Sequence, residues 1–245
     1  MTRAELKQQA KDTLRGRWGT AIGMILVYEL LIGAIGMVAN FIPFFGSIAL
    51  LVVSIPLSFG FIGQLLKFSR KEQAGVVDFF TIGFNNFGKS WSIVGYTFLK
   101  LVGYIIAYAV CMVAMAGLVV ASINAESVAM LAIGMIIIGI LFFIIYIGLI
   151  VKSYLYVLTE YIGNDNPNMS GKEVVEKSGE LMKGHRWELF VLELSFIGWA
   201  ILSILTCGIG LLWLAPYMQI TTIKFYESLA FGDNSNNNAE VITEQ

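Results

Sequence analysis

Charge, proline, cysteine and histidine are all scarce in this sequence. Charged residues make up 13% of the 245 residues, and there are 4 prolines, 2 cysteines and 1 histidine. An average soluble domain is about 25% charged. The lone histidine, His185, and the absence of a C-x-x-C pair argue against a zinc site, and no cofactor is implied. The motifs of hydrolases, phosphate-binding loops and dinucleotide folds are also missing, so we do not expect an enzyme.

Hydrophobic residues, in contrast, make up 57% of the chain. A core of this size cannot bury so much apolar surface, so lipid must cover it, and a backbone in lipid is satisfied within helices. We therefore predict an all-α, polytopic membrane protein. A spanning helix needs roughly 20 apolar residues. The six candidate spans cover residues 20–40, 46–66, 91–122, 127–151 (with the helix extending to 161), 187–205 and 210–225.

The basic residues predict the topology. All 16 lysines and arginines fall on one side, either in the segments there or, for Lys100 and Lys224, in the adjoining parts of the third and sixth spans. The three opposite connections, near Pro43, Asn124 and Cys207, contain none. Because cytoplasmic loops collect Lys and Arg, both termini are predicted to be cytoplasmic. The Asn-rich segment 232–245 is predicted to be a disordered cytoplasmic tail.

The sequence contains an internal repeat, in which the same three kinds of segment follow one another in the same order three times. Residues 1–70, 71–165 and 166–231 each begin with an amphipathic helix, continue with a Gly-basic-Trp signature and end with a hairpin of two spans. The first and third helices open with capping boxes, at Thr2 and Ser170. We therefore predict one membrane domain over 1–231 that is built from three repeats.

The three signatures predict an interface with lipid headgroups. A helix in the headgroup plane keeps its cations near anionic lipid, and Trp favours the membrane interface. The predicted lipid contacts are Arg3, Lys7, Lys11, Arg15, Arg17, Trp18, Lys89, Trp91, Lys183, Arg186 and Trp187. The lipid bilayer is thus the expected partner, and nucleic acid is not expected.

Three motifs resemble a known family. They are Leu-Lys-Gln-Gln-Ala at 6–10, Leu-Arg-Gly-Arg-Trp at 14–18 and Lys-Gly-His-Arg-Trp at 183–187. With the stretch 189–226, they resemble the domain of unknown function 975 family of bacterial integral membrane proteins. The architecture is also similar to the membrane domain of some glycerophosphodiester phosphodiesterases, without their catalytic domain. The resemblance implies a plasma-membrane protein and brings no activity or functional residues.

Three charged residues lie well inside predicted spans, away from the span ends. Glu29 stands nine residues after Thr20, about 14 Å into its span. A carboxylate at that depth costs several kcal/mol and is a functional-site hypothesis by default. One interpretation is a cluster of Glu29, Lys100 and Glu193. The other is that Lys100 and Glu193 reach the interface and that Glu29 is protonated or bonded to a tyrosine.

Two functions remain open from the sequence. The first is a protein without enzymatic activity that organises or senses lipid at the cytoplasmic leaflet, which the basic amphipathic helices favour. The second is a small transporter or channel that uses Glu29, with spans broken at Pro56 and Pro216.

Overall fold

The computed structural model describes residues 1–42, 45–124, 128–206 and 208–243, and the regular structure in these residues is helical. The predicted turns at Pro43 and Cys207 therefore lie outside the described residues. The helices are α1 (Arg3–Leu14), α2 (Trp18–Asn40), α3 (Phe45–Ser69), α4 (Asp78–Asn85), α5 (Phe87–Asn124), α6 (Val128–Ser153), the 3-10 turn η1 (Tyr154–Tyr156), α7 (Thr159–Asp165), α8 (Gly171–Leu181), α9 (Arg186–Leu194), α10 (Ile197–Leu205) and α11 (Leu211–Thr243).

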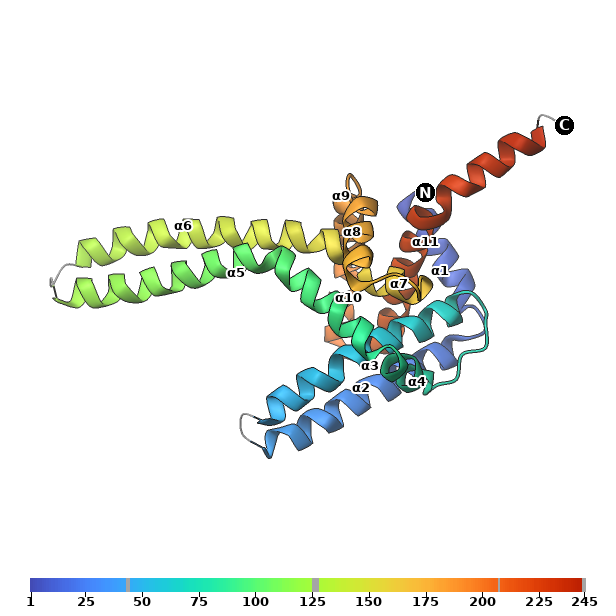
Figure 1. Ribbon diagram of the computed structural model, residues 1–245, viewed down its shortest axis with the longest axis horizontal. Helices are drawn as coiled ribbons and strands as arrows, with labels where there is room; N and C mark the ends of the chain where they lie inside the picture. Colours follow the sequence, from blue (N-terminus) through green and yellow to red (C-terminus); the bar gives the residue numbers. More distant parts are fainter. Residues whose placement is uncertain (43–44, 125–127, 207, 244–245) are drawn as a thin grey trace.

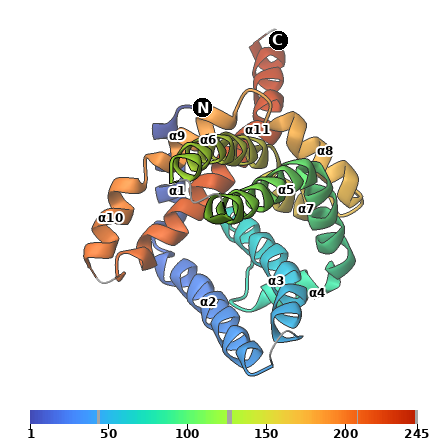
Figure 2. The ribbon, with the colours of Figure 1, turned by 90° about the vertical axis from the view of Figure 1, so that its left-hand side faces the viewer.

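The long helices project from a compact end, which we call the base. The base is formed by α1, α4, α7, α8 and α9 with the adjoining parts of α2, α3, α5 and α11. The α2–α3 and α5–α6 hairpins leave it in different directions (Figure 1). Viewed toward their tips, the α2–α3 hairpin and the turn between α10 and α11 lie on different sides of the α5–α6 hairpin (Figure 2).

Five helical segments in the described residues are long and apolar enough to cross a membrane. They are Trp18–Asn40, Phe45–Ser69, Phe87–Ile123, Leu131–Asp165 and Arg186–Leu205. The most apolar window of the fourth is 0% buried inside the protein. Apolar surface of this extent on a soluble protein would cause aggregation, so these helices are covered by lipid. The prediction of an all-α, multi-pass membrane protein is therefore confirmed.

The sixth predicted span, 210–225, is not among these five segments. It forms the first half of α11, where Pro216, Gln219 and Lys224 dilute the apolar residues. The two prolines also behave differently from the expected breaks, since α3 continues through Pro56 and α11 continues through Pro216.

The interruptions lie instead at positions without proline. The predicted extension of the fourth span to residue 161 is divided by η1 before α7 begins. The fifth predicted span is divided at Ser195 and Phe196, between α9 and α10. Helix α11 continues to Thr243 and projects from the base (Figure 1), so it runs through most of the segment for which the composition predicts disorder.

The amphipathic helices bury their apolar faces in the base. Leu6, Ala10 and Leu14 of α1 are almost fully buried, as are Val174 and Val175 of α8 and its C-cap residue Met182. Both predicted capping boxes are present, from Thr2 to Glu5 and from Ser170 to Glu173. These apolar side chains of the two helices thus pack on neighbouring helices of the base.

Helix α4 is only partly buried. Phe79 is fully buried, whereas Phe80 and Phe84 remain exposed on the outer side. The buried side approaches α3 very closely, because a Cβ atom at Gly60 would overlap the carbonyl oxygen of Phe79 and one at Gly83 would overlap that of Pro56. Glycine at both positions lets the two backbones touch.

The three amphipathic helices pack in a circular order. Helix α4 packs on α3, α8 packs on α7 and α5, and α1 packs on α11. In terms of the segments 1–70, 71–165 and 166–231, each amphipathic helix contacts the last helix of the segment before it. The first segment contacts the third, so the order closes on itself.

Candidate functional site

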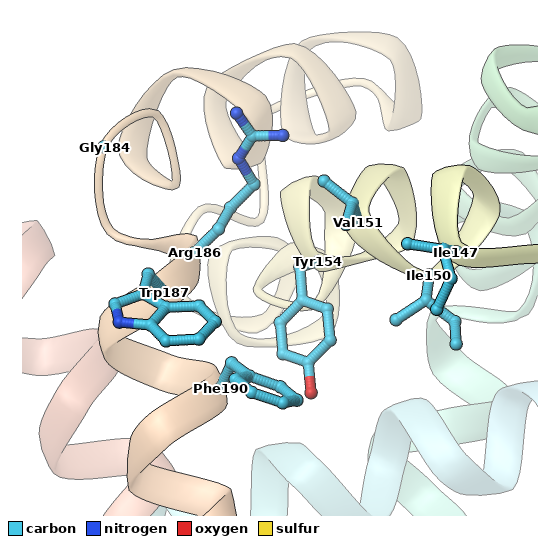
Figure 3. A pocket seen from close by; sticks show the side chains of 8 residues that line it. All are labelled: Ile147, Ile150, Val151, Tyr154, Gly184, Arg186, Trp187 and Phe190. Atoms are coloured by element: carbon cyan, nitrogen blue, oxygen red, sulfur yellow. The ribbon is translucent and has the colours of Figure 1, made fainter. Parts of the chain in front are cut away.

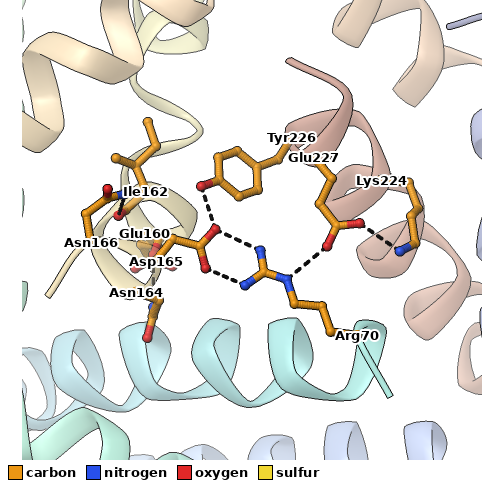
Figure 4. Close-up of polar contacts among 9 residues, drawn as sticks. All are labelled: Arg70, Glu160, Ile162, Asn164, Asp165, Asn166, Lys224, Tyr226 and Glu227. Atoms are coloured by element: carbon orange, nitrogen blue, oxygen red, sulfur yellow. Dashed lines mark hydrogen bonds and ion pairs between the residues drawn. The ribbon is translucent and has the colours of Figure 1, made fainter. Parts of the chain in front are cut away.

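A polar network joins the ends of α3 and α7 to the middle of α11 in the base (Figure 4). The guanidinium of Arg70, just after α3, donates two hydrogen bonds of 2.7 Å to the carboxylate of Asp165 at the end of α7. Its Nε also donates to Glu227 of α11 at 3.1 Å. Tyr226 donates its hydroxyl to Asp165 at 2.8 Å, and Lys224 donates to Glu227 at 2.7 Å. The network therefore connects the last helices of the three segments.

The surroundings of this network favour the charged arginine and the neutral tyrosine. Hydrogen bonds to Asp165 raise the pKa of Arg70 further above its already high value. Burial, followed by the hydrogen bond to Asp165, raises the pKa of Tyr226. The side chains of Asp165 and Glu227 are 12% and 18% exposed, so without Arg70 they would be two nearly buried carboxylates with too few cations.

Two residues of the Gly-basic-Trp signatures, Arg17 and Lys89, bind the carbonyl oxygens at helix ends. Arg17 donates to the carbonyl oxygen of Phe68 at 3.1 Å and stacks on the same residue's ring. Lys89 donates to the carbonyl oxygens of Gly163, at 2.8 Å, and Asn166. Both cations therefore occupy the negative end of the last helix of their own segment. These bonds give each cation a partner within the protein, and the role as a lipid contact stays a prediction.

Two lysines of α1 also contact the protein. Lys7 donates to the carbonyl oxygen of Ser195 at 3.4 Å and lies 4.2 Å from the ring centroid of Phe196, at the break between α9 and α10. Lys11 lies over the ring of Tyr217 in α11 at 5.8 Å. Partial burial, followed by the charge of Lys11, lowers the pKa of Lys7. These two lysines thus hold α1 against the third segment.

Of the remaining predicted lipid contacts, some are exposed and others are half-buried. Arg3, Arg15 and Lys183 are exposed, and within the described residues they form no ion pair. Trp187 is 70% exposed. Trp18 and Trp91 are half-buried.

An apolar groove lies between α6 and α9 and encloses about 490 Å³ (Figure 3). One side is formed by Ile147, Ile150 and Val151, which are the last residues of the apolar part of α6. The lining is completed by Tyr154, Gly184, Arg186, Trp187 and Phe190. Arg186 is its one cation, and it extends away from the two aromatic rings of α9 (Figure 3). The groove thus combines a hydrocarbon surface with a positive charge at one end.

The three charged residues of the predicted spans are not joined in the structure. Glu29 and Lys100 are exposed on α2 and α5, and among the described residues no ion pair connects them with each other or with Glu193. Glu193 instead accepts a hydrogen bond from the hydroxyl of Tyr154 beside the groove.

The position of Lys100 favours its interpretation as an interface residue. Tyr104, one turn further along α5, packs on Gly148 and lies 5.9 Å from the amino group of Lys152, near the end of α6. Lys100 therefore lies at the level where α6 reaches the base. A long side chain there can extend its amino group to the interface.

Sequence reasoning did not find the polar network or the groove. Arg70 and Asp165 are 95 residues apart, and Arg70 and Glu227 are 157 apart. The available signal was their position, because each charged residue stands at or near the point where the last apolar helix of its segment ends. That signal predicts polar residues near the interface and says nothing about which of them pair.

The comparisons with known proteins identify a family and no activity. Neither the curated proteins nor the solved structures contain a match to this chain. A family model described as "Protein of unknown function (DUF975)" matches residues 1–231, which is all of the chain before the Asn-rich tail. The chain, whose motifs resembled this family at the sequence level, therefore belongs to the DUF975 family.

Proposed function

We propose that this protein is a non-enzymatic membrane protein that binds anionic lipid at the cytoplasmic leaflet and thereby organises or senses it. The observation that carries the proposal is the groove between α6 and α9. Its apolar wall continues the lipid-covered surface of α6, and its one cation, Arg186, lies at the base end. A lipid whose acyl chain lies along Ile147 and Ile150 and whose phosphate lies near Arg186 would match both the apolar wall and the positive charge of the groove.

The proposal includes six membrane crossings. Helices α9 and α10 together supply a 20-residue apolar segment. Helix α11 begins beside the far end of α10, where the backbone N–H of Gly210 donates to Thr206, and it reaches the polar network of the base at Tyr226. It therefore returns over the distance that α9 and α10 cover, which supports a third hairpin.

A threefold repeat is the arrangement that best accounts for the packing. In the circular order of α1, α4 and α8, each segment makes the same two kinds of contact. Its amphipathic helix packs on the last helix of the segment before it, and its own last helix receives the amphipathic helix of the segment after it. The caps formed by Arg17 and Lys89 give the first two segments the same internal bond. The signature of the third segment differs, since His185 pairs with Glu188 at 2.8 Å and Arg186 lines the groove.

The proposed orientation puts the base and both termini in the cytoplasm of a bacterial plasma membrane. It is supported by the basic residues, which belong to the base and to the helix ends that adjoin it. Reporter fusions at each terminus test it in cells: we expect a cytoplasmic signal from both. A signal from opposite sides would contradict six crossings.

The lipid proposal is tested with the full-length protein in detergent. Native mass spectrometry would compare the retention of phosphatidylglycerol and phosphatidylcholine. We expect a preference for the anionic lipid, which Arg186→Gln lowers about fivefold, because one cation near a membrane surface contributes about 1 kcal/mol. Lys172→Gln is the matched control, since Lys172 is exposed on α8, pairs with Glu176 and does not line the groove. An equal preference in Arg186→Gln and the native protein would contradict the proposal.

A further inference from the structure

A second cavity, distinct from the groove, lies in the base between α3, α5 and α7, and it opens beside the exposed side chains of Val94 and Phe98. It encloses about 280 Å³. Its wall is mostly hydrocarbon, from Phe59, Ile93, Val94, Phe98 and Leu101. The polar part comes from Ser90, Thr97, Thr159 and Glu160. A carboxylate thus lies in a small chamber lined mainly by aromatic and aliphatic side chains.

The carboxylate of Glu160 has little compensation from the protein. It accepts hydrogen bonds from one hydroxyl, that of Ser58, at 3.0 and 3.2 Å. Within the described residues no cation lies in ion-pair distance of it. Asp165, on the same helix (Figure 4), is bonded by both Arg70 and Tyr226. A carboxylate removed from water is stable only with a proton or a positive partner.

A second polar group in the cavity also lacks a partner. The hydroxyl oxygen of Thr97 is buried and has no hydrogen-bond partner in the structure. Buried hydroxyl groups in proteins are nearly always bonded, so an orphan of this kind points to a missing partner. Ser90 and Thr159 donate to the carbonyl oxygens of Phe87 and Tyr156, each three residues earlier in the chain, and keep free lone pairs.

We infer that this cavity binds a small organic cation, namely an ammonium group carried on an apolar body. The ammonium would donate to Glu160 and Thr97, and the rings of Phe59 and Phe98 would contact the apolar body and add cation–π attraction. A bare metal ion fits less well, because the wall offers few oxygen ligands beside the carboxylate. The volume is below that of typical drug-sized pockets, so the ligand has about ten non-hydrogen atoms.

The experiment uses the full chain in detergent with 2-phenylethylammonium as the probe and 2-phenylethanol as its uncharged counterpart. Calorimetry should give binding of the ammonium at least about tenfold tighter than that of the alcohol. Glu160→Gln should remove this difference. Glu193→Gln is the control, because Glu193 also accepts from a hydroxyl on another helix but does not line the cavity. It should leave the affinity unchanged.

Three results would overturn the inference: no binding of the ammonium, equal binding of ammonium and alcohol, or unchanged binding in Glu160→Gln. Competition by Na⁺ or K⁺ at the concentration of the probe would overturn the assignment to an organic cation. Should Glu160→Gln fail to fold, Phe98→Ala tests the site instead, because it removes an aromatic side chain of α5 that lines the cavity. Unchanged affinity for the ammonium in that variant would also refute the site.

Discussion

The guanidinium of Arg70 and the carboxylate of Asp165 form a bidentate ion pair with two hydrogen bonds of 2.7 Å. Paired planar groups of this kind are among the stronger polar contacts in proteins. Because Asp165 is largely buried and also bonded by Tyr226, the pair fixes the end of α7 against α3 and α11.

We expect Arg70→Met to lower the free energy of unfolding by about 2 kcal/mol. This figure lies between those for an exposed pair and a buried one, since Arg70 is 30% exposed. Thermal unfolding in detergent would measure the loss, with Lys172→Gln as the control on an exposed pair. In a double-mutant cycle, Asp165→Asn should add little once Arg70 is gone. Fully additive losses would contradict a direct coupling.

The close approach of α3 and α4 predicts a strong effect from one methyl group. Gly83→Ala should destabilise the protein by about 1–3 kcal/mol, since its Cβ would overlap the carbonyl oxygen of Pro56. Gly95→Ala is the matched control in α5, where the added Cβ meets no atom within 4 Å. It should be neutral or stabilising by up to about 1 kcal/mol. Equal melting temperatures for the two variants would refute the backbone contact.

The cap of α7 by Lys89 can be separated from a role in lipid binding. Lys89→Gln should cost about 1 kcal/mol, because it weakens charge-assisted bonds to Gly163 and Asn166. The loss should be the same in zwitterionic and anionic lipid nanodiscs, as chemical unfolding would measure. Arg15→Gln serves as the control, since Arg15 is exposed. A loss confined to anionic lipid would favour the headgroup contact predicted from the sequence.

The capping box of α8 predicts a dependence on acid. The backbone and side-chain hydrogen bonds from Ser170 lower the pKa of Glu173. A group whose pKa is lowered by folding stabilises the protein above its unfolded pKa of about 4.3 and loses this effect as the pH falls through its folded value. Glu173→Gln should therefore lower the melting temperature at pH 7, and the difference from the native protein should shrink toward pH 3. Glu180→Gln, on the same helix but outside the capping box, is the control variant.

The sequence predicted the helices better than their partners. The runs 20–40, 46–66, 91–122 and 127–151 match α2, α3, α5 and α6 to within four residues at each end, because hydrophobic length is a local property. The capping boxes at Thr2 and Ser170 are also local, and both are present.

The contacts of the charged residues could not be predicted in this way. Arg17 and Lys89 were assigned to lipid, because a basic residue beside Trp has the same local pattern whether it faces headgroups or a helix end. The sequence did not indicate Glu160 as a site residue, because it follows a long apolar run and its hydrogen-bond partner Ser58 is 102 residues away. Such pairings depend on how the segments fold together.

The packing of α1 on α11 has a consequence for biosynthesis. A ribosome makes α1 some two hundred residues before α11, so its buried stripe of Leu6, Ala10 and Leu14 has no protein partner while the chain emerges. In that interval the nascent helix can lie on the membrane surface, and its basic residues would hold it there. The lipid contact that the sequence predicts for α1 would then belong to the unfinished chain, and the completed protein would replace it with α11.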